Sequence, residues 1–414
     1  MADSPGISTV AAEPASRERS VDRGAVAIAM FCVLLLSYVL MAADRYLFPV
    51  LAVDVRKDFG LTLSSAGLLS TIFTLGLGIG GLPTGYLLHR FSRKSVLLTG
   101  IAIFSAATAL TTVSGGFWGL LFCLAAQGIG MAMLATSMFA LAASYFARYR
   151  AAAIGSVNVC YGLGGFFGPI IATALLASYG TWHAPMIAFG AFGFVMIVAI
   201  VASVRSWFSE VVPSVKVRSD ALGASSLANR NTVILTVLSM IHGLSMYGFL
   251  GQYPTFLRTS LNYDPKLAGF VVSFFGLGAV ASIAGGWVGD RLSPRVSLSG
   301  SFLCVAVLGY LFFLPSLSAL SREILTCIYG VVGSAVLYVN LAGYHVKALR
   351  ASLASRGSGM FVTTLYGAAA FSGYLIAAIA GRVGWLTAGE IQMTLLCVIG
   401  AVLSLALRPS EMST

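Results

Sequence analysis

Long apolar runs separated by short polar breaks recur along the whole chain. A helix needs about 20 apolar residues to cross a hydrocarbon layer about 30 Å thick, and runs of about this length recur from residue 25 to residue 408. The predicted spans cover residues 25–53, 61–88, 95–113, 117–147, 151–178, 184–207, 231–258, 264–290, 297–318, 322–348, 357–382 and 387–408. The pattern predicts an all-α integral membrane protein whose even number of spans leaves both termini on one side.

The composition excludes an ordinary soluble protein. Hydrophobic residues make up 58% of the chain and charged residues 9%, far from the usage of soluble domains. The net charge of +11 raises the question of nucleic-acid binding, but the basic residues lie in short loops and form no basic face. We therefore expect a lipid bilayer around the chain and no nucleic-acid partner.

The distribution of basic residues orients the spans. Lysine and arginine are about three times as frequent in the tails and even-numbered loops as in the odd-numbered loops. Cytoplasmic loops carry this excess in multi-pass proteins. We therefore expect an inner-membrane protein with both termini in the cytoplasm.

A polar segment divides the predicted spans six and six. It runs from Phe208 to Arg230 and is the longest stretch between two spans. The predicted organisation is an irregular cytoplasmic tail (1–23), a first six-helix bundle (24–207), a cytoplasmic linker (208–230), a second six-helix bundle (231–408) and a short tail (409–414).

A short motif recurs after the second span of each half, about 201 residues apart. The second copy, Gly-x-x-x-Asp-Arg-x-x-x-Arg from Gly286 to Arg295, resembles the signature loop of the major facilitator superfamily. The first copy begins at Gly85 and has His89 in place of the usual aspartate. The resemblance implies the major facilitator fold, with two pseudo-symmetric six-helix bundles and a loop that latches one gating state. Glycine at this corner is expected to let two helices approach closely.

The expected gating residues follow from this resemblance and from a second motif. Gly164-Gly-Phe-Phe-Gly168-Pro169 in the fifth span resembles the Gly-x-x-x-Gly-Pro motif of the same superfamily. The gating residues are then Gly85, His89, Arg90, Arg93, Gly168, Pro169, Gly286, Asp290, Arg291 and Arg295.

Asp44 is the one acid that lies well inside an apolar run, and Arg45 follows it directly. Charges inside a membrane are costly unless they are paired or face a water-filled cavity, so both are expected to share a solvated central face. With Pro49 and Lys57-Asp58-Phe-Gly, the pair resembles the organic-anion (anion:cation) symporter and spinster-like branches. That resemblance implies that Arg45 binds an anionic group and that Asp44 couples transport to protons. The alternative is a structural ion pair near the membrane surface.

Further candidates follow from the helices that line the central cavity in this superfamily, the first and seventh and the fourth and tenth. The predicted substrate-binding residues are Arg45, Gln127, Tyr161, His242, Tyr247, Gln252, Tyr338 and Asn340. Gln127 and Tyr161 are the weaker members of this set, and Asn158 and Tyr366 are further weak candidates. The alternative for the amides, phenols and imidazole is hydrogen bonding between neighbouring helices. A single central arginine favours a small monovalent carboxylate over a phosphate ester.

No catalytic constellation, metal-ligand spacing or phosphate-binding loop occurs in the sequence. We expect neither an enzyme nor a bound cofactor or metal. The predicted function is secondary active transport of a small organic anion by alternating access, with a coupling proton and with the monomer as the functional unit. Two alternatives stay open: proton-coupled efflux of amphiphilic molecules, which the Gly-Pro motif suggests, and a membrane sensor that does not transport.

Overall fold

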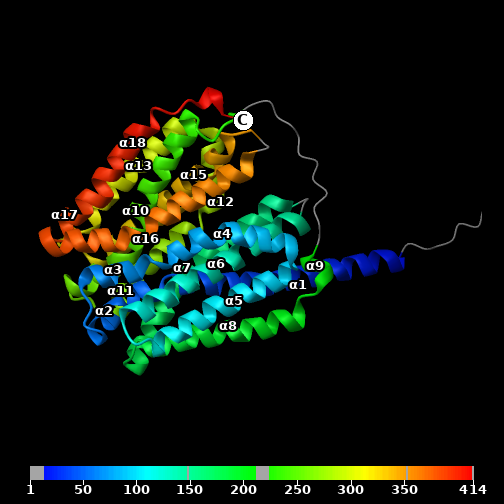
Figure 1. Cartoon of the computed structure of the whole chain (residues 1–414), viewed down its shortest axis with the longest axis horizontal. Coiled ribbons are helices and arrows are strands. Elements are labelled where there is room, and N and C mark those ends of the chain that lie inside the picture. The colour runs from blue at the N-terminus through cyan, green and yellow to red at the C-terminus, as the bar shows by residue number, and fades with distance from the viewer. Residues whose placement is uncertain (1–13, 147–148, 211–222, 351–352, 413–414) are drawn as a thin grey trace, which may run out of the picture.

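The computed structural model describes residues 14–146, 149–210, 223–350 and 353–412, which form mainly α-helices (Figure 1). The helices of the first half are α1 (Pro14–Asp44), α2 (Leu47–Asp58), α3 (Leu63–Thr71), α4 (Phe73–Arg90), α5 (Arg93–Leu110), α6 (Phe117–Tyr145), α7 (Arg150–Tyr179), α8 (His183–Ser203) and α9 (Ser206–Ser209). Those of the second half are α10 (Arg230–Thr259), α11 (Pro265–Ala279), α12 (Ser282–Arg291), α13 (Pro294–Phe312), α14 (Ala319–Tyr329), α15 (Val339–Lys347), α16 (Ala354–Val383), α17 (Trp385–Gly389) and α18 (Leu396–Ser404).

Together these helices form twelve membrane spans in two six-helix bundles. In the described part of the chain, eleven helical stretches are long and apolar enough to cross a membrane, and α11, which α12 continues, supplies the remaining span. Two spans contain π-helical turns, Gly330–Tyr338 between α14 and α15 and Glu390–Leu395 between α17 and α18. Such turns often mark functional sites, and the first of them contributes to the cavity described below.

The repeated motif folds in the same way in both halves. Ser92 accepts a hydrogen bond from the backbone N–H of Ser95 and so caps α5, and Ser293 caps α13 through the N–H of Val296. A serine at the N-cap satisfies one of the free N–H groups at the start of a helix. The two caps therefore begin the third span of each bundle at equivalent places.

The N-terminal segment differs from the prediction. We expected an irregular tail up to residue 23, whereas α1 already begins at Pro14 and continues to Asp44. Proline is well tolerated in the first turn of a helix, and the segment that follows contains no glycine until Gly24. Figure 1 shows this end of α1 projecting beyond the other helices.

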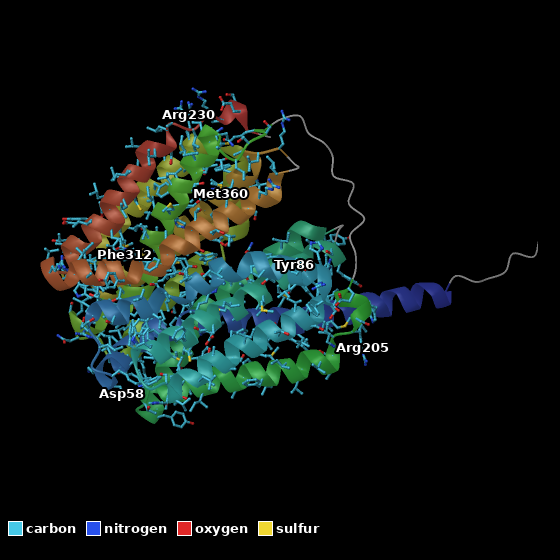
Figure 2. All side chains as sticks on the ribbon, in the orientation of Figure 1. Asp58, Tyr86, Arg205, Arg230, Phe312 and Met360 are labelled. Carbon is cyan, nitrogen blue, oxygen red and sulfur yellow. The ribbon has the colours of Figure 1, made fainter. Side chains whose placement is uncertain are left out.

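The two bundles meet closely at one end of the molecule. Figure 2 places Asp58 and Phe312 at this end, which we call the closed side, and Arg205 and Arg230 at the other, which we call the terminal side. On the closed side, α3 packs on α16 and α7 on α11. A Cβ atom at Gly67 would collide with the carbonyl oxygen of Gly373. The close approach of the backbones therefore requires glycine at this position.

Candidate functional site

A cavity of about 390 Å³ lies between the two bundles. Its walls come from α1, α4, α6 and α7 of the first bundle and from α10, α12, α15, α16 and the first π-helical turn of the second. Ser358, near the start of α16, is an exposed part of its lining, so the cavity opens toward the terminal side. Its volume is near the lower end of the range for ligand pockets, about 300–1,000 Å³, and therefore suits a small molecule.

Arg45 is the only charged side chain in the described lining of this cavity. The residue is 8% exposed, and its guanidinium carbon lies 5.4 Å from the centre of the Tyr161 ring. Its Nε atom is buried without a hydrogen-bond partner, and no salt bridge among the described residues includes it. Because a buried cation without a counter-charge is costly, the site is suited to receive an anion.

The local sequence explains why Arg45 lies at a break in the first span. α1 ends at Asp44, and α2 begins at Leu47 after a short turn. Pro49 has no N–H group, so it cannot donate the hydrogen bond to residue 45 that would continue the helix. Discontinuous helices often carry the binding groups of transporters.

Asp44 faces away from the cavity, into the first bundle. The residue is 2% exposed, and its Oδ2 atom accepts hydrogen bonds from Thr108 Oγ1 at 2.8 Å and from Gln127 Nε2 at 2.6 Å. Its other oxygen, Oδ1, has no partner. The expectation that Asp44 and Arg45 share one solvated face is therefore wrong, because Asp44 ends α1 while Arg45 lies in the turn that follows, and their side chains point in different directions.

Three further predicted residues line the cavity together with Arg45, namely Tyr161, Tyr247 and Tyr338. The two weaker candidates, Asn158 and Tyr366, line it as well. The hydroxyl groups of Tyr338 and Tyr366 are 3.2 Å apart. These side chains come from α7, α10, the first π-helical turn and α16.

The other four predicted residues lie outside the cavity lining. Gln127 bonds Asp44, as above, and Asn340 donates to the Gly285 carbonyl at 3.4 Å and to Ser297 Oγ at 3.3 Å. His242 is fully buried with both ring nitrogens unpartnered, and Gln252 is fully buried with Oε1 unpartnered. Direct substrate contact by these four has no support in this conformation, and for Gln127 and Asn340 the bonding between helices is the better interpretation.

The sequence interpretation missed several side chains of the lining. They are Tyr38, Thr136, Phe139, Ser282, Ser334 and Ser358. Tyr38 could have been found, because it precedes Arg45 by two helical turns and so lies on the same face of α1. The serines carry no such signal, since serine is common throughout membrane helices.

The signature loop of the first half is anchored within its own bundle. The backbone N–H groups of Arg93 and Lys94 donate to the Glu210 carboxylate at 3.0 and 3.2 Å, and Lys94 Nζ donates to the Val204 carbonyl at 2.6 Å. A carboxylate at the N-terminus of α5 and an ammonium at the C-terminus of α8 both complement the helix dipoles. His89 and Arg90 are exposed, and Arg90 lies over the Tyr86 ring at 6.0 Å.

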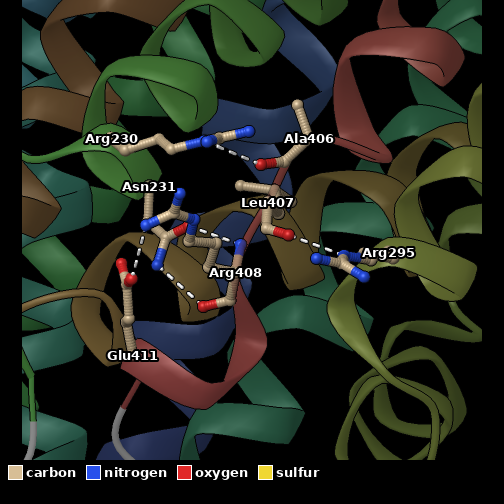
Figure 3. Close-up of polar contacts among 7 residues, drawn as sticks. All are labelled: Arg230, Asn231, Arg295, Ala406, Leu407, Arg408 and Glu411. Carbon is tan, nitrogen blue, oxygen red and sulfur yellow. Dashed lines mark hydrogen bonds and ion pairs between the residues drawn. The ribbon is translucent and has the colours of Figure 1, made fainter.

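The second loop repeats this arrangement with different residues (Figure 3). Arg295 Nε donates to the Leu407 carbonyl at 2.6 Å, just beyond α18. Next to it, Arg230 Nε donates to the Ala406 carbonyl and Arg408 pairs with Glu411. Arg291 is exposed and stacks over Trp287 at 3.9 Å, whereas the side chain of Asp290 lies outside the described part.

The glycines of the two loops do not have the expected packing role in this conformation. A Cβ atom at Gly85 would meet no atom within 4 Å, and one at Gly286 would meet only Val339 Cγ1 at an ordinary 3.8 Å. The close contact in the second half falls one residue earlier, at Gly285 against the Ala335 carbonyl. On the terminal side, therefore, there is open space where a side chain at Gly85 would lie.

The Gly-Pro motif of the fifth span lies against the first span. A Cβ atom at Gly168 would lie 2.7 Å from the carbonyl oxygen of Ala43, one residue before Asp44. Pro169 lies inside α7, and its carbonyl accepts a hydrogen bond from Thr173 Oγ1 at 2.8 Å. The motif thus holds α7 tightly against the end of α1.

An ion pair joins the two bundles on the closed side. Arg258, near the end of α10, holds Asp54 of α2 with both terminal nitrogens, and its Nη2 atom lies 3.0 Å from Asp54 Oδ1. Thr71 Oγ1 of α3 donates to the Ala370 carbonyl of α16 at 2.9 Å. These contacts close the end of the molecule opposite the cavity mouth.

Comparison with known proteins identifies the family. Residues 34–374 match the family model described as Major Facilitator Superfamily, which is most of the chain. Within the described residues, no cluster of three or more histidine, cysteine or acidic side chains could hold a metal ion.

Several relatives with functional names are distant in sequence. A "Probable L-galactonate transporter" from Escherichia coli is 23% identical over 76% of this chain and 75% of its own length. A "Cis,cis-muconate transport protein" from Acinetobacter baylyi is 25% identical over 66% of this chain and 67% of its own length. A "Hexuronate transporter" from Bacillus subtilis is 22% identical over 64% of this chain and 65% of its own length. A relative from Haemophilus influenzae is matched over 63% of its own length, slightly under two thirds.

The fold also matches solved structures. A bacterial homolog of the human lysosomal transporter Spinster, in an inward-facing and unoccupied conformation, superposes with a TM-score of 0.68. The match covers 92% of this chain and 95% of that one at 18% sequence identity. This likeness supports the twelve-span, two-bundle architecture predicted from the sequence.

Proposed function

Because the chain belongs to the Major Facilitator Superfamily, we propose that it is a secondary transporter that moves a small monovalent carboxylate across the inner membrane by alternating access. Family membership makes it a multi-pass membrane transporter rather than an enzyme. The relatives named for galactonate, muconate and hexuronate transport support an organic acid as the substrate.

The observation that carries this proposal is the guanidinium of Arg45 in the cavity wall, which has no acidic partner among the described residues. Hydrogen bonds between an arginine and a carboxylate are short, strong and often bidentate. A carboxylate bound there supplies the counter-charge that Arg45 lacks within the described residues. The substrate charge thus compensates the only charge of the described lining.

Asp44 provides proton coupling in this mechanism. Its carboxylate is buried, receives only neutral hydrogen-bond donors and has one unpartnered oxygen. Protonation removes a charge from an apolar interior, which favours the neutral form. Since Asp44 and Arg45 flank the same break in the first span, a movement of that turn on anion binding reaches the proton site directly.

The orientation and the gating roles complete the proposal. We place both termini and residues 208–230 in the cytoplasm, as the distribution of basic residues indicates, and we retain the division into two bundles joined by that linker. The monomer is the functional unit. The signature loops come together when the terminal side closes, and Gly168 and Pro169 keep α7 against α1 during that movement.

Uptake into proteoliposomes tests the function. With a proton gradient imposed, we expect accumulation of a carboxylate substrate, loss of binding in Arg45→Gln by about 10- to 100-fold, and no accumulation in Asp44→Asn. Exchange of labelled for unlabelled substrate should survive in Asp44→Asn, because exchange needs no net proton movement.

Matched substitutions serve as controls. Arg382→Gln changes an exposed arginine at the end of α16, and Glu323→Gln changes a half-buried acid on α14; neither residue lines the cavity. Both should transport as the parent protein does. Unchanged anion affinity in Arg45→Gln contradicts the binding role, and loss of exchange together with uptake in Asp44→Asn contradicts a role limited to coupling.

A further inference from the structure

Aromatic rings form much of the cavity wall around the single cation. Six aromatic side chains line the described cavity: Tyr38, Phe139, Tyr161, Tyr247, Tyr338 and Tyr366. They come from both bundles, from α1, α6 and α7 on one side and from α10, the first π-helical turn and α16 on the other. A molecule held by Arg45 therefore lies among ring faces and edges contributed by both halves.

The rings are fixed in position by contacts with each other. Tyr247 and Tyr366 have ring centres 5.9 Å apart in an edge-to-face arrangement, and Tyr247 lies 6.1 Å from Phe73 on the first bundle. Tyr38 and Phe139 are 6.1 Å apart, also edge to face. Rings held in this way offer a preorganised surface for another π-system.

Much of the polar capacity of the tyrosines is already used. The hydroxyls of Tyr338 and Tyr366 bond each other at 3.2 Å, and the hydroxyl of Tyr46 donates to that of Tyr161 at 3.2 Å. Among the described lining residues, Asn158 is the only one with an amide side chain, and none has a carboxylate. A polyhydroxylated sugar acid needs many hydrogen-bond partners, and each hydroxyl buried without one costs free energy.

The charge of the cavity lining narrows the substrate class further. The described lining contains one arginine and no lysine or histidine. A dianion would leave one of its charges uncompensated in a partly apolar cavity, which is costly. The small cavity volume, about 390 Å³, also favours a compact ligand.

We infer that the substrate is a monocarboxylate with a planar aromatic or conjugated body, whose carboxylate binds Arg45 and whose π-system lies against the tyrosine rings. This inference rests on the proposed function and specifies its substrate class. Sugar acids, saturated acids and dianions are expected to bind more weakly, although relatives are named for transport of sugar acids and of a dianion.

Binding of three monocarboxylates to the purified full-length protein tests this inference. The probes are benzoate, cyclohexanecarboxylate and gluconate, measured by calorimetry and by competition against uptake in proteoliposomes. Cyclohexanecarboxylate has the same charge and a similar size and is at least as apolar as benzoate, so hydrophobic burial alone cannot make benzoate the tighter ligand. We expect benzoate to bind about 10-fold tighter than either alternative, the size of effect that aromatic contacts produce.

Variants of Tyr247 test whether the aromatic rings cause the preference for benzoate over cyclohexanecarboxylate. Tyr247→Phe keeps the aromatic face and should keep the preference for benzoate over cyclohexanecarboxylate. Tyr247→Leu keeps apolar volume without the π-system and should reduce that preference to about 2-fold or less. Tyr310→Leu, at an exposed position on α13, is the control and should behave as the parent protein does.

The possible failures are distinguishable. Two outcomes overturn the aromatic substrate class and leave anion transport standing, provided that Arg45→Gln still abolishes binding. In the first, gluconate binds as tightly as benzoate; in the second, benzoate and cyclohexanecarboxylate bind equally. If Tyr247→Leu keeps the full preference, the rings are not its cause and the inference is overturned. If none of the three anions binds, or if Arg45→Gln binds them unchanged, the proposed function is overturned with it.

Discussion

Asp44 and Arg45 are adjacent in sequence and lie in different surroundings. Asp44 is held inside the first bundle by Thr108 and Gln127, while Arg45 reaches the cavity between the bundles. The separation arises where α1 ends, because Asp44 is its last residue and Arg45 lies in the turn that follows. It allows one turn of chain to hold the proposed anion-binding group and the proposed proton-binding group without mutual neutralisation.

Gln127 is predicted to stabilise the fold through Asp44. Gln127→Leu removes a donor to the buried carboxyl group, and leaving a buried polar group without its partner costs about 1–3 kcal/mol. Gln252→Leu is the matched control, since Gln252 is also buried but bonds only the adjacent Gly251 carbonyl and leaves its own Oε1 without a partner. We expect the thermal unfolding midpoint in detergent to fall clearly for Gln127→Leu and little for Gln252→Leu. Equal shifts would show that the bond to Asp44 contributes nothing special.

Two interrupted elements contribute directly to the cavity. The turn between α1 and α2 presents Arg45, and the π-helical turn before α15 presents Ser334 and Tyr338. Interruptions of this kind leave backbone groups without regular helical partners, so they are tolerated in a membrane only where protein or water surrounds them. On the closed side, α2 continues to the ion pair with α10, which links the turn that carries Arg45 to the contact between bundles.

The Asp54–Arg258 ion pair is predicted to stabilise closure of that side. In Asp54→Asn, the population with separated α2 and α10 ends should rise, because Arg258 loses its charged partner. Spin labels at Lys57 and Lys266, both exposed, in a background without native cysteines, should report a broader and longer distance distribution. The double variant Asp54→Arg with Arg258→Asp, which swaps the two charges, should restore the narrow distance distribution. An unchanged distribution in Asp54→Asn would remove the pair from the closing mechanism.

At the scale of the whole molecule, the structure is closed on one side and has a cavity that opens on the other. Glycines mark the difference: a Cβ atom at Gly67 would collide with Gly373 on the closed side, whereas one at Gly85 would meet no atom within 4 Å on the terminal side. Under alternating access the two ends exchange these environments. The repeated loop glycine is then needed in the conformation opposite to this one.

Alanine substitutions at these two glycines are predicted to affect the conformational equilibrium differently. Gly67→Ala places a Cβ where the Gly373 carbonyl lies, so it should disfavour the present conformation and lengthen the distance between labels at Lys57 and Lys266. Gly85→Ala should leave that distance unchanged or shift the equilibrium toward the present conformation. A longer distance in both variants would indicate general destabilisation instead of a side-specific clash.

Much of the architecture was predictable, since its signals are local. Apolar length identified the spans, and the motif at Gly85 and Gly286 identified two related halves. The structure bears out twelve spans in two bundles. The N-terminal extension of α1 from Pro14 was missed because hydropathy detects the membrane span and not the helix that precedes it.

The site was only partly predictable. Arg45 and the tyrosines Tyr161, Tyr247 and Tyr338 were found because polar groups on central helices are few and conspicuous. His242 and Gln252 were equally conspicuous, yet they lie buried outside the lining. Whether a polar side chain turns toward the cavity or toward a neighbouring helix depends on the rotation of each helix, which hydropathy does not specify.

The sequence by itself determined the membrane environment, the number of spans and the paired halves, because these follow from chain length, apolar content and repetition. Only the tertiary structure decided that Asp44 and Arg45 separate, that aromatic rings surround the lone cation, and that Asp54 meets Arg258. Each of these depends on which faces of distant helices meet. That choice arises from packing between residues far apart in the chain, where no local pattern records it.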